Sequence, residues 1–114
     1  MTERQEIYQT KWSRKPKHKF RAVRTELDGI KFPSKKQANY YAELKLKVQA
    51  GFVLFFLMEV PIRLPGSVVY RCDFVEFHAD GSCHFVDVKG VRTPQYILKK
   101  KQVEALYPIE IEEK

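Results

Sequence analysis

The chain has 114 residues, of which 44% are hydrophobic and 13% aromatic, and it carries a formal net charge of +7. This length suits one domain with a single hydrophobic core, and the composition excludes an intrinsically disordered chain. The apolar run from Phe52 to Met58 is much shorter than the roughly 20 residues of a transmembrane helix, and the charges near the N-terminus exclude a secretory signal. We therefore expect a cytoplasmic protein without a membrane partner.

The excess positive charge lies in one short segment. Residues 11–24 hold seven Lys and Arg residues and no acidic residue, whereas the rest of the chain holds 14 basic and 14 acidic residues. Aromatic side chains are interspersed among these cations. The pattern is typical of a nucleic-acid partner, because each neutralised phosphate releases counterions, although a solvated basic tail would have the same composition.

We accordingly predict an N-terminal basic arm over residues 1–24 and one folded domain over residues 25–114. The arm is expected to contact DNA through its basic side chains, namely Arg14, Lys15, Lys17, Lys19, Arg21 and Arg24.

The first elements of the domain are a hairpin and a helix. Residues 25–32 contain the turn dipeptide Asp28-Gly29 between two short apolar segments, which predicts a β-hairpin. Ser34 is a suitable N-cap for a helix that runs to about Ala50 and ends at Gly51. The helical spacing places four side chains on one inward face: Gln37, Tyr41, Leu44 and Val48.

Strands dominate the second half of the chain. We expect a strand over the second half of residues 52–64, near a sheet edge because Pro61 cannot donate a ladder hydrogen bond. A turn at 65–67 leads to two strands, 68–78 and 82–89, and Thr93-Pro94 predicts the start of a helix that runs to about Leu106. A short strand over 109–111 completes a mixed α/β fold.

The register of the hairpin between residues 68 and 89 decides how its acidic residues are placed. A two-residue loop would place Asp73 opposite Val88, on the other face from Asp87. A three-residue loop, with Gly81 in the left-handed position, would place Asp73 opposite Asp87. We favour the second register because it leaves both faces mostly apolar, as a sheet covered on two sides requires. It also places Lys89 on the same face as both aspartates.

Two carboxylates placed opposite each other repel, so this pair requires compensation. A divalent cation provides it: two carboxylates, the Val88 carbonyl and water suit Mg²⁺, with Mn²⁺ as a substitute. Lys89 would then orient a water molecule or stabilise charge on a phosphoryl oxygen. The spacing alone is equally compatible with a simple Asp87–Lys89 ion pair and an exposed Asp73.

Six short motifs of the sequence resemble one protein family, and together they extend from about residue 19 to the C-terminus. They are Asp28-Gly29-Ile30-Lys31-Phe32, Ser34-Lys35-Lys36, Tyr41-Ala42-Glu43-Leu44, Asp73-Phe74-Val75, Asp87-Val88-Lys89-Gly90 and Tyr107-Pro108. The chain resembles the PD-(D/E)xK nuclease superfamily and, more closely, small phage and prophage proteins regarded as endonucleases.

The resemblance implies a restriction-endonuclease-like core, with a mixed central β-sheet flanked by helices on both faces. It also implies a Mg²⁺-dependent endodeoxyribonuclease of phage DNA metabolism, acting in the cytoplasm of the bacterial host, with selectivity for branched or junction DNA. Asp73 and Asp87 would hold the metal, and Lys89 would assist the attacking water.

The chain departs from this family at two positions. Pro33 and Gln37 stand where relatives usually carry aspartate and glutamate, and an acid from this helix commonly completes such metal sites. Gln37 offers only a neutral amide oxygen. Glu43 is the nearest acid on the helix, and it would either reach the metal or pair with Lys47 on the helix surface. Glu59 is a second candidate to supply the missing charge.

Two further cations are candidates for contacts with DNA phosphates. Arg92 follows the Lys89-Gly90 bend, and loops at strand ends are where open α/β sheets bind ligands. Lys99 lies on the last helix.

We expect a homodimer, because two symmetric cuts need two active sites. The alternative is a catalytically weak or inactive DNA-binding protein that retains the nuclease fold, which the neutral Gln37 favours.

Overall fold

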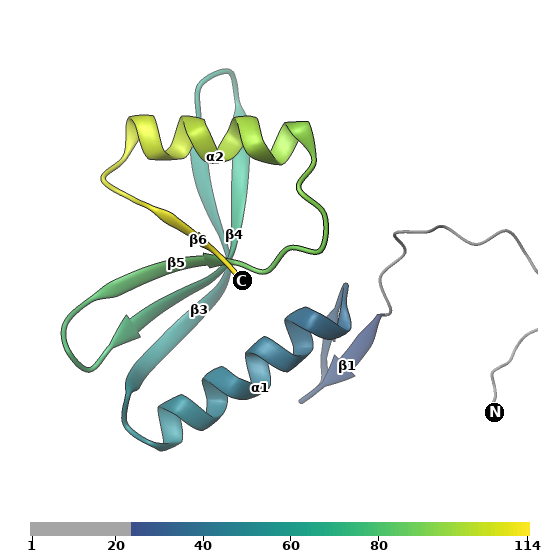
Figure 1. Cartoon of the computed structure of the whole chain (residues 1–114), viewed down its shortest axis with the longest axis vertical. Helices are drawn as coiled ribbons and strands as arrows, with labels where there is room; N and C mark the ends of the chain where they lie inside the picture. The colour runs from purple at the N-terminus through teal and green to yellow at the C-terminus, as the bar shows by residue number, and fades with distance from the viewer. Residues whose placement is uncertain (1–23) are drawn as a thin grey trace, which may run out of the picture.

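The computed structural model describes residues 24–114, and these form two helices and six strands (Figure 1). In chain order the elements are β1 (Thr25–Leu27), β2 (Ile30–Phe32), α1 (Lys35–Gln49), β3 (Val53–Leu64), β4 (Val68–His78), β5 (Cys83–Asp87), α2 (Pro94–Leu106) and β6 (Ile111–Glu113). The predicted mixed α/β class is confirmed.

The predicted hairpin and first helix are both confirmed. Strands β1 and β2 pair antiparallel around Asp28 and Gly29, whose positive φ values of 54° and 75° suit a tight hairpin turn. The Asp28 carboxylate also accepts hydrogen bonds from Tyr41 and Lys45 of α1, which tie the hairpin to the helix. Helix α1 begins where the Ser34 side chain accepts a hydrogen bond from the Gln37 amide.

The other four strands form one mixed sheet in the order β3-β4-β5-β6. Neighbouring strands are antiparallel except for β5 and β6, which are parallel. Strand β3 lies at the edge, as predicted, but the prediction that only the second half of residues 52–64 forms a strand is wrong. The first half also pairs with β4, from Val53 opposite His78 onward, with a bulge between Val53 and Phe55.

The last strand lies two residues later than predicted. The amide of Ile109 donates to the Tyr107 carbonyl, which keeps the chain in a turn directly after α2. Strand β6 therefore begins at Ile111, where it pairs with Phe85 of β5.

The predicted register of the β4–β5 hairpin is confirmed. Phe77 pairs with Cys83 and Phe74 with Val86, so the same register continued by one position places Asp73 opposite Asp87. The loop is closed by hydrogen bonds from the His78 amide to Ser82 and from the Gly81 amide to His78. Gly81 has a φ of 92°, which supplies the left-handed residue that a three-residue loop needs.

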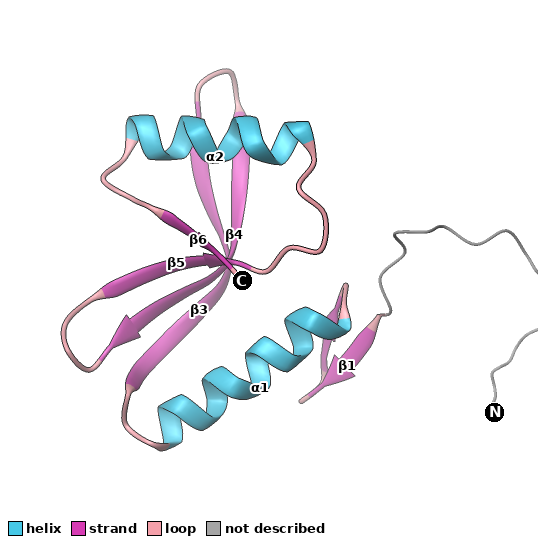
Figure 2. Ribbon diagram, viewed as in Figure 1, coloured by secondary structure: helices cyan, strands magenta, loops and turns pink. Residues whose placement is uncertain are grey.

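The two helices pack against opposite faces of the strongly twisted sheet (Figure 2). On β4, Phe74 joins the core beneath α1, whereas the next residue, Val75, joins the core beneath α2. Cys72 packs in the α2 core, although the alternation of side chains along a strand would place it on the Phe74 face. The even-numbered side chains of β4 thus change core at Asp73, from Tyr70 and Cys72 beneath α2 to Phe74 beneath α1. Neither helix is long and apolar enough to cross a membrane.

Candidate active site

The aspartate pair lies where β4 passes between the two cores. Asp87 is the last residue of β5 and is completely buried. Its Oδ2 atom accepts a hydrogen bond from the Tyr70 hydroxyl. Asp73 is partly buried, and its Oδ2 atom accepts a hydrogen bond of 2.9 Å from the Val88 amide. The backbone after β5 therefore fixes one carboxylate, and a tyrosine of β4 fixes the other.

The second oxygen of Asp87 has no hydrogen-bond partner. Within residues 24–114, Asp87 Oδ1 is the only buried side-chain nitrogen or oxygen atom in this condition. Lys89 Nζ lies 3.5 Å away and half-buried, which is an ion-pair distance but a poor hydrogen bond. A buried carboxylate oxygen without a partner is costly, so a ligand at this position would remove a real energetic penalty.

The Lys89 side chain is held between this carboxylate and an aromatic ring. Its Nζ atom lies 4.6 Å from the centre of the Tyr96 ring, which allows a cation–π interaction. The Lys89 carbonyl accepts a hydrogen bond of 2.9 Å from Lys36 of α1. The backbone and ammonium group of Lys89 are therefore both anchored, and the predicted shared face of Asp87 and Lys89 is confirmed.

Burial raises the pKa of Asp73 to about 7, and both a side-chain hydrogen bond with Asp87 and the charge of that carboxyl group add to this increase. The Val88 amide and Lys89 act in the opposite direction but do not offset it. Two carboxyl groups in one partly desolvated site cannot both ionise freely. Near neutral pH, Asp73 therefore exchanges a proton readily, and a bound cation would favour its ionised form.

A pocket of about 230 Å³ opens beside Asp73 on the α1 side of the sheet. Gln37 and Glu59 border it, and Gln37 is buried. Glu59 of β3 lies between Met58 and Val60, which pair with Phe74 and Cys72 of β4. The same register places Glu59 opposite Asp73 of β4. Glu59 has a φ of 51°, which is uncommon for a non-glycine residue and occurs often at functional sites.

Of the three candidates for completing a metal site, the structure places Gln37 and Glu59 beside Asp73. Glu43 is exposed on α1 and does not border this pocket. Its predicted ion pair with Lys47 is absent from the part of the chain that the structure describes.

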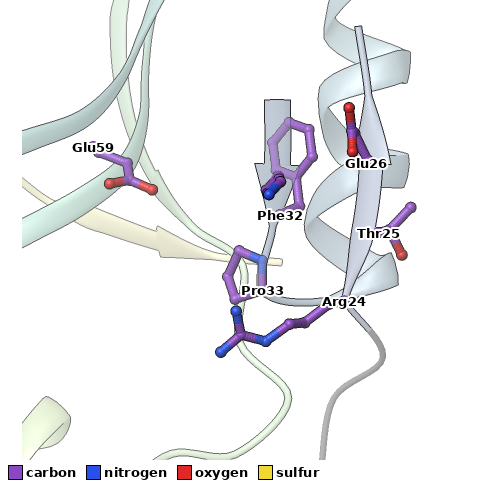
Figure 3. Close-up of a pocket in the computed structure, with 7 residues that line it drawn as sticks. Arg24, Thr25, Glu26, Phe32, Pro33 and Glu59 are labelled. Atoms are coloured by element: carbon purple, nitrogen blue, oxygen red, sulfur yellow. The ribbon is translucent and has the colours of Figure 1, made fainter. Parts of the chain in front are cut away.

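A larger hollow of about 440 Å³ adjoins the first and is lined by the β1–β2 hairpin. Figure 3 shows Glu59 on β3 on one side of it, and Phe32, Pro33 and Arg24 on the other. Both hollows are bordered by Glu59 and by Lys31 and Phe32, so they meet at Glu59. Arg24 is the last residue of the predicted basic arm. The other five predicted contacts of the arm lie outside the described residues: Arg14, Lys15, Lys17, Lys19 and Arg21.

A third pocket lies on the other side of the aspartate pair, between β4 and α2. Its volume is about 230 Å³, and Lys89 and Lys99 both border it. The Lys99 ammonium donates a hydrogen bond to the Val69 carbonyl. Arg92 is exposed outside this pocket, where it forms an ion pair of 3.2 Å with Glu113. Lys99 is thus brought to the site, whereas Arg92 is partly neutralised.

The residues present fit a Mg²⁺ ion with few protein ligands. Among residues 24–114, no three His, Cys, Asp or Glu side chains come together closely enough to hold a metal. Mg²⁺ keeps several waters and is commonly bound through one or two carboxylates. The unpartnered Asp87 Oδ1 and the adjacent Asp73 supply two. The structure gives no contact for the Val88 carbonyl, so its role as a ligand stays a prediction.

Sequence reasoning missed three residues around the pair: Tyr70, Arg71 and Tyr96. The Tyr70 hydroxyl binds Asp87, and burial together with that contact raises the Tyr70 pKa above its usual range. Tyr96 carries Lys89 over its ring, and Arg71 borders the third pocket. The polar ends of tyrosines within otherwise apolar segments are the available signal, because a buried tyrosine hydroxyl usually has a partner.

No curated protein and no solved structure matches the chain. Residues 17–112 match the sequence model of a family described as a protein of unknown function, DUF1064. The matched range covers all of β1 to α2 and reaches into β6, and so includes both aspartates, Lys89 and the three pockets. The chain belongs to the DUF1064 family.

Proposed function

We propose that this protein is a metal-dependent DNA endonuclease with a restriction-endonuclease-like core. One observation carries the proposal: Asp73 and Asp87 share a buried site in which Asp87 Oδ1 has no hydrogen-bond partner and Lys89 Nζ stands 3.5 Å from it. A neutral Asp73 can donate a hydrogen bond to Asp87, but that partner is lost when both carboxyl groups ionise. A cation bound by both carboxylates would satisfy it and would relieve their repulsion.

Each residue of the site has a specific role in this proposal. Asp73 and Asp87 hold Mg²⁺, with Gln37 and Glu59 facing the same pocket as Asp73. When bound, the ion supplies positive charge to a phosphoryl oxygen and makes water more acidic. Tyr70 fixes the orientation of Asp87, and Tyr96 holds the Lys89 ammonium near the carboxylates. Lys89 can then orient the attacking water and stabilise negative charge that develops on the phosphate.

The experiment that tests the proposal uses three DNA substrates. The full chain is incubated with supercoiled plasmid, linear duplex and a four-way junction, each with Mg²⁺, Mn²⁺ or EDTA. We expect cleavage that requires the metal, with the junction cut in preference to the linear duplex. Absence of cleavage from every substrate at saturating protein and metal would contradict the proposal.

A second candidate function is DNA binding without cleavage. The neutral Gln37, buried in the pocket beside Asp73, favours it, because a ligand set with less negative charge holds Mg²⁺ more weakly. In this case the same DNA substrates would be bound in EDTA and in Mg²⁺ alike and would remain intact.

We also propose that the active form is a homodimer that joins through β3. This strand is the edge of the sheet, and its first half exposes large apolar side chains. They are Leu54, Phe55 and Leu57, and the exposed Phe52 directly precedes the strand. An exposed apolar edge strand favours pairing with a second copy of itself, which would also supply the second active site needed for paired cuts. Light scattering should give the mass of a dimer for the parent chain and of a monomer for Leu57→Lys, and a monomeric parent would contradict the proposal.

A further inference from the structure

The pocket between β4 and α2 is lined by cations and contains no acidic residue. Its volume is about 230 Å³. The lining residues are Tyr70, Arg71, Lys89, Thr93, Gln95, Tyr96 and Lys99. Three of these seven carry a positive charge, so like charges gather around one small hollow. Such an arrangement is unfavourable unless an anion occupies the hollow or carboxylates neutralise the cations.

Nearby carboxylates neutralise these three cations only in part. Within residues 24–114, Arg71 forms no ion pair or hydrogen bond through its guanidinium group. Lys99 donates to the neutral Val69 carbonyl, 3.2 Å away. Lys89 alone faces a carboxylate, that of Asp87 at 3.5 Å. At least two full positive charges are therefore available to a ligand in the pocket.

The start of α2 adds further affinity for an anion. Thr93 is the N-cap of α2 and its side chain accepts a hydrogen bond of 3.1 Å from the Tyr96 amide. No acidic residue lies in the first turn, so the positive end of the helix dipole is not neutralised there. Gln95 adds an amide donor to the same wall. Charge, dipole and neutral donors thus converge on one hollow.

The size of the pocket restricts what it can hold. Pockets for drug-sized molecules usually measure about 300 to 1,000 Å³, and this one is smaller. It suits a compact anionic group rather than a complete nucleotide with its base. Arg71 can form two parallel hydrogen bonds with a phosphate, which is the geometry that guanidinium groups favour.

We propose that this pocket binds a backbone phosphate of DNA next to the phosphate that is hydrolysed, with Arg71 and Lys99 as its principal ligands. The inference rests on the proposed function, because it takes the aspartate pair as the cleavage site. Lys89 borders the pocket and also faces Asp87, so it joins the two positions. Holding the neighbouring phosphate would fix the register of the strand across the aspartates.

The first test measures binding at the pocket without metal or cleavage. Backbone amide NMR spectra of the full chain in EDTA are recorded during titration with inorganic phosphate, at constant ionic strength set with chloride. We expect saturable shifts centred on the amides of Thr93, Gln95 and Tyr96, and their loss in Arg71→Ala/Lys99→Gln. Glutamine at position 99 keeps an N–H donor that is one bond shorter than lysine, and an unchanged melting temperature shows that the fold is preserved. Shifts no larger than those with chloride would overturn the proposal.

The second test uses DNA. The same double variant should bind duplex DNA at least 10-fold more weakly in EDTA, and should flatten the slope of log affinity against log salt by about 1, since the one phosphate held in the pocket contributes roughly 0.9. The matched control is Arg63→Ala/Lys101→Gln, which removes two exposed cations from β3 and α2 that do not border the pocket. Equal losses in the two double variants would overturn the assignment of the pocket.

Cleavage then separates this inference from the proposed function. If the parent cleaves DNA, the pocket variant should need more DNA for half-maximal rate and should reach a lower rate at saturation, because the neighbouring phosphate no longer holds the strand in register. An unchanged DNA requirement in a cleaving enzyme would overturn the pocket while the nuclease proposal stands. Phosphate shifts at the pocket in a protein that binds DNA but cuts none would overturn the nuclease proposal and retain the pocket as a phosphate site.

Discussion

The two pockets on either side of Asp87 have opposite electrostatic character. The pocket on the α1 side is bordered by Asp73, Glu59 and the neutral Gln37, whereas the pocket on the α2 side is bordered by Arg71, Lys89 and Lys99. The first is also bordered by Lys31, so its lining holds two carboxyl groups and one cation. A site that holds a cation and an anion side by side needs acidic side chains around the first and basic side chains around the second.

Each helix contributes to one of these pockets, and the sheet joins them. Gln37 of α1 reaches the acidic pocket, and Lys99 of α2 reaches the basic one. Strand β4 supplies Asp73 to the first pocket and Arg71 to the second. At this point its even-numbered side chains change from the core beneath α2 to the core beneath α1. The twist of the sheet thereby places side chains of both signs close together without neutralising them all against each other.

The largest expected effect comes from the residue between the pockets. Asp87→Asn should lower the rate of Mg²⁺-dependent cleavage by at least about 100-fold, the scale on which loss of a charge-stabilising group acts. Binding of DNA in EDTA should stay within a few-fold of the parent, because the basic pocket is intact. Rates from plasmid nicking and affinities from fluorescence anisotropy measure the two effects. Glu43→Gln is the matched control and should retain the parental rate, since Glu43 is exposed away from the pocket.

The next effect distinguishes the basic pocket from the basic arm. Deletion of residues 11–24 removes seven cations and should flatten the slope of log affinity against log salt by up to about 6, at roughly 0.9 per phosphate contact. The cleavage rate at saturating DNA should change little, because the arm is expected to supply affinity and the pocket to supply position. Filter binding from low to high salt gives the slope. An unchanged slope would mean that the arm is a solvated tail.

The acidic pocket can be altered by one substitution. Gln37→Glu adds a carboxylate beside Asp73 and Glu59, and should lower the Mg²⁺ concentration for half-maximal cleavage several-fold, because more ligand charge favours the ion. The same change should lower the melting temperature in EDTA, through added repulsion. The exposed control Gln49→Glu, at the end of α1, should change neither value. A higher melting temperature of Gln37→Glu in EDTA would show that the carboxylates of this pocket do not repel the added one.

The sequence was sufficient for most of the elements, although not for the bounds of β3 and β6, and for the placement of Asp73 opposite Asp87. The requirement that both sheet faces stay mostly apolar selected the three-residue loop, in which Gly81 takes the left-handed position, and that register placed Asp73 opposite Asp87. Helix α1 was equally predictable from the sequence, because Ser34, the spaced apolar residues and Gly51 all indicate the same bounds.

The basic pocket could not be predicted from the sequence in the same way. It depends on how α2 lies across β4, and α2 buries only Tyr96 and Val103, so its apolar pattern does not define the orientation of the helix. From the sequence, Arg71 is one exposed cation of an alternating strand, and no pattern predicts that it lies near Lys99. The unpartnered Asp87 Oδ1 is likewise a property of three-dimensional packing.

The smallest expected effect concerns the pH dependence of stability in the absence of metal. Burial raises the pKa of Asp73 from 3.8 to about 7 in the folded chain. Between these values the native state holds a proton that the unfolded state has released, so stability falls as pH rises from about 4 to 7 and then levels off. Asp73→Asn removes this dependence and can still accept the hydrogen bond from Val88 through its amide oxygen.

Melting curves in EDTA at pH 5 and pH 8 test this sign. The variant should melt slightly higher than the parent at pH 5 and higher by several degrees more at pH 8, since 1 kcal/mol corresponds to about 4 to 8 °C in a domain of this size. Mg²⁺ should raise the melting temperature of the parent more at pH 8 than at pH 5, because a bound cation favours the ionised carboxylate, and should leave Asp73→Asn nearly unchanged. A variant that melts lower than the parent at pH 8 would show that the Asp73 carboxylate is stabilised by its surroundings without metal, and the acidic pocket would then need no cation to complete it.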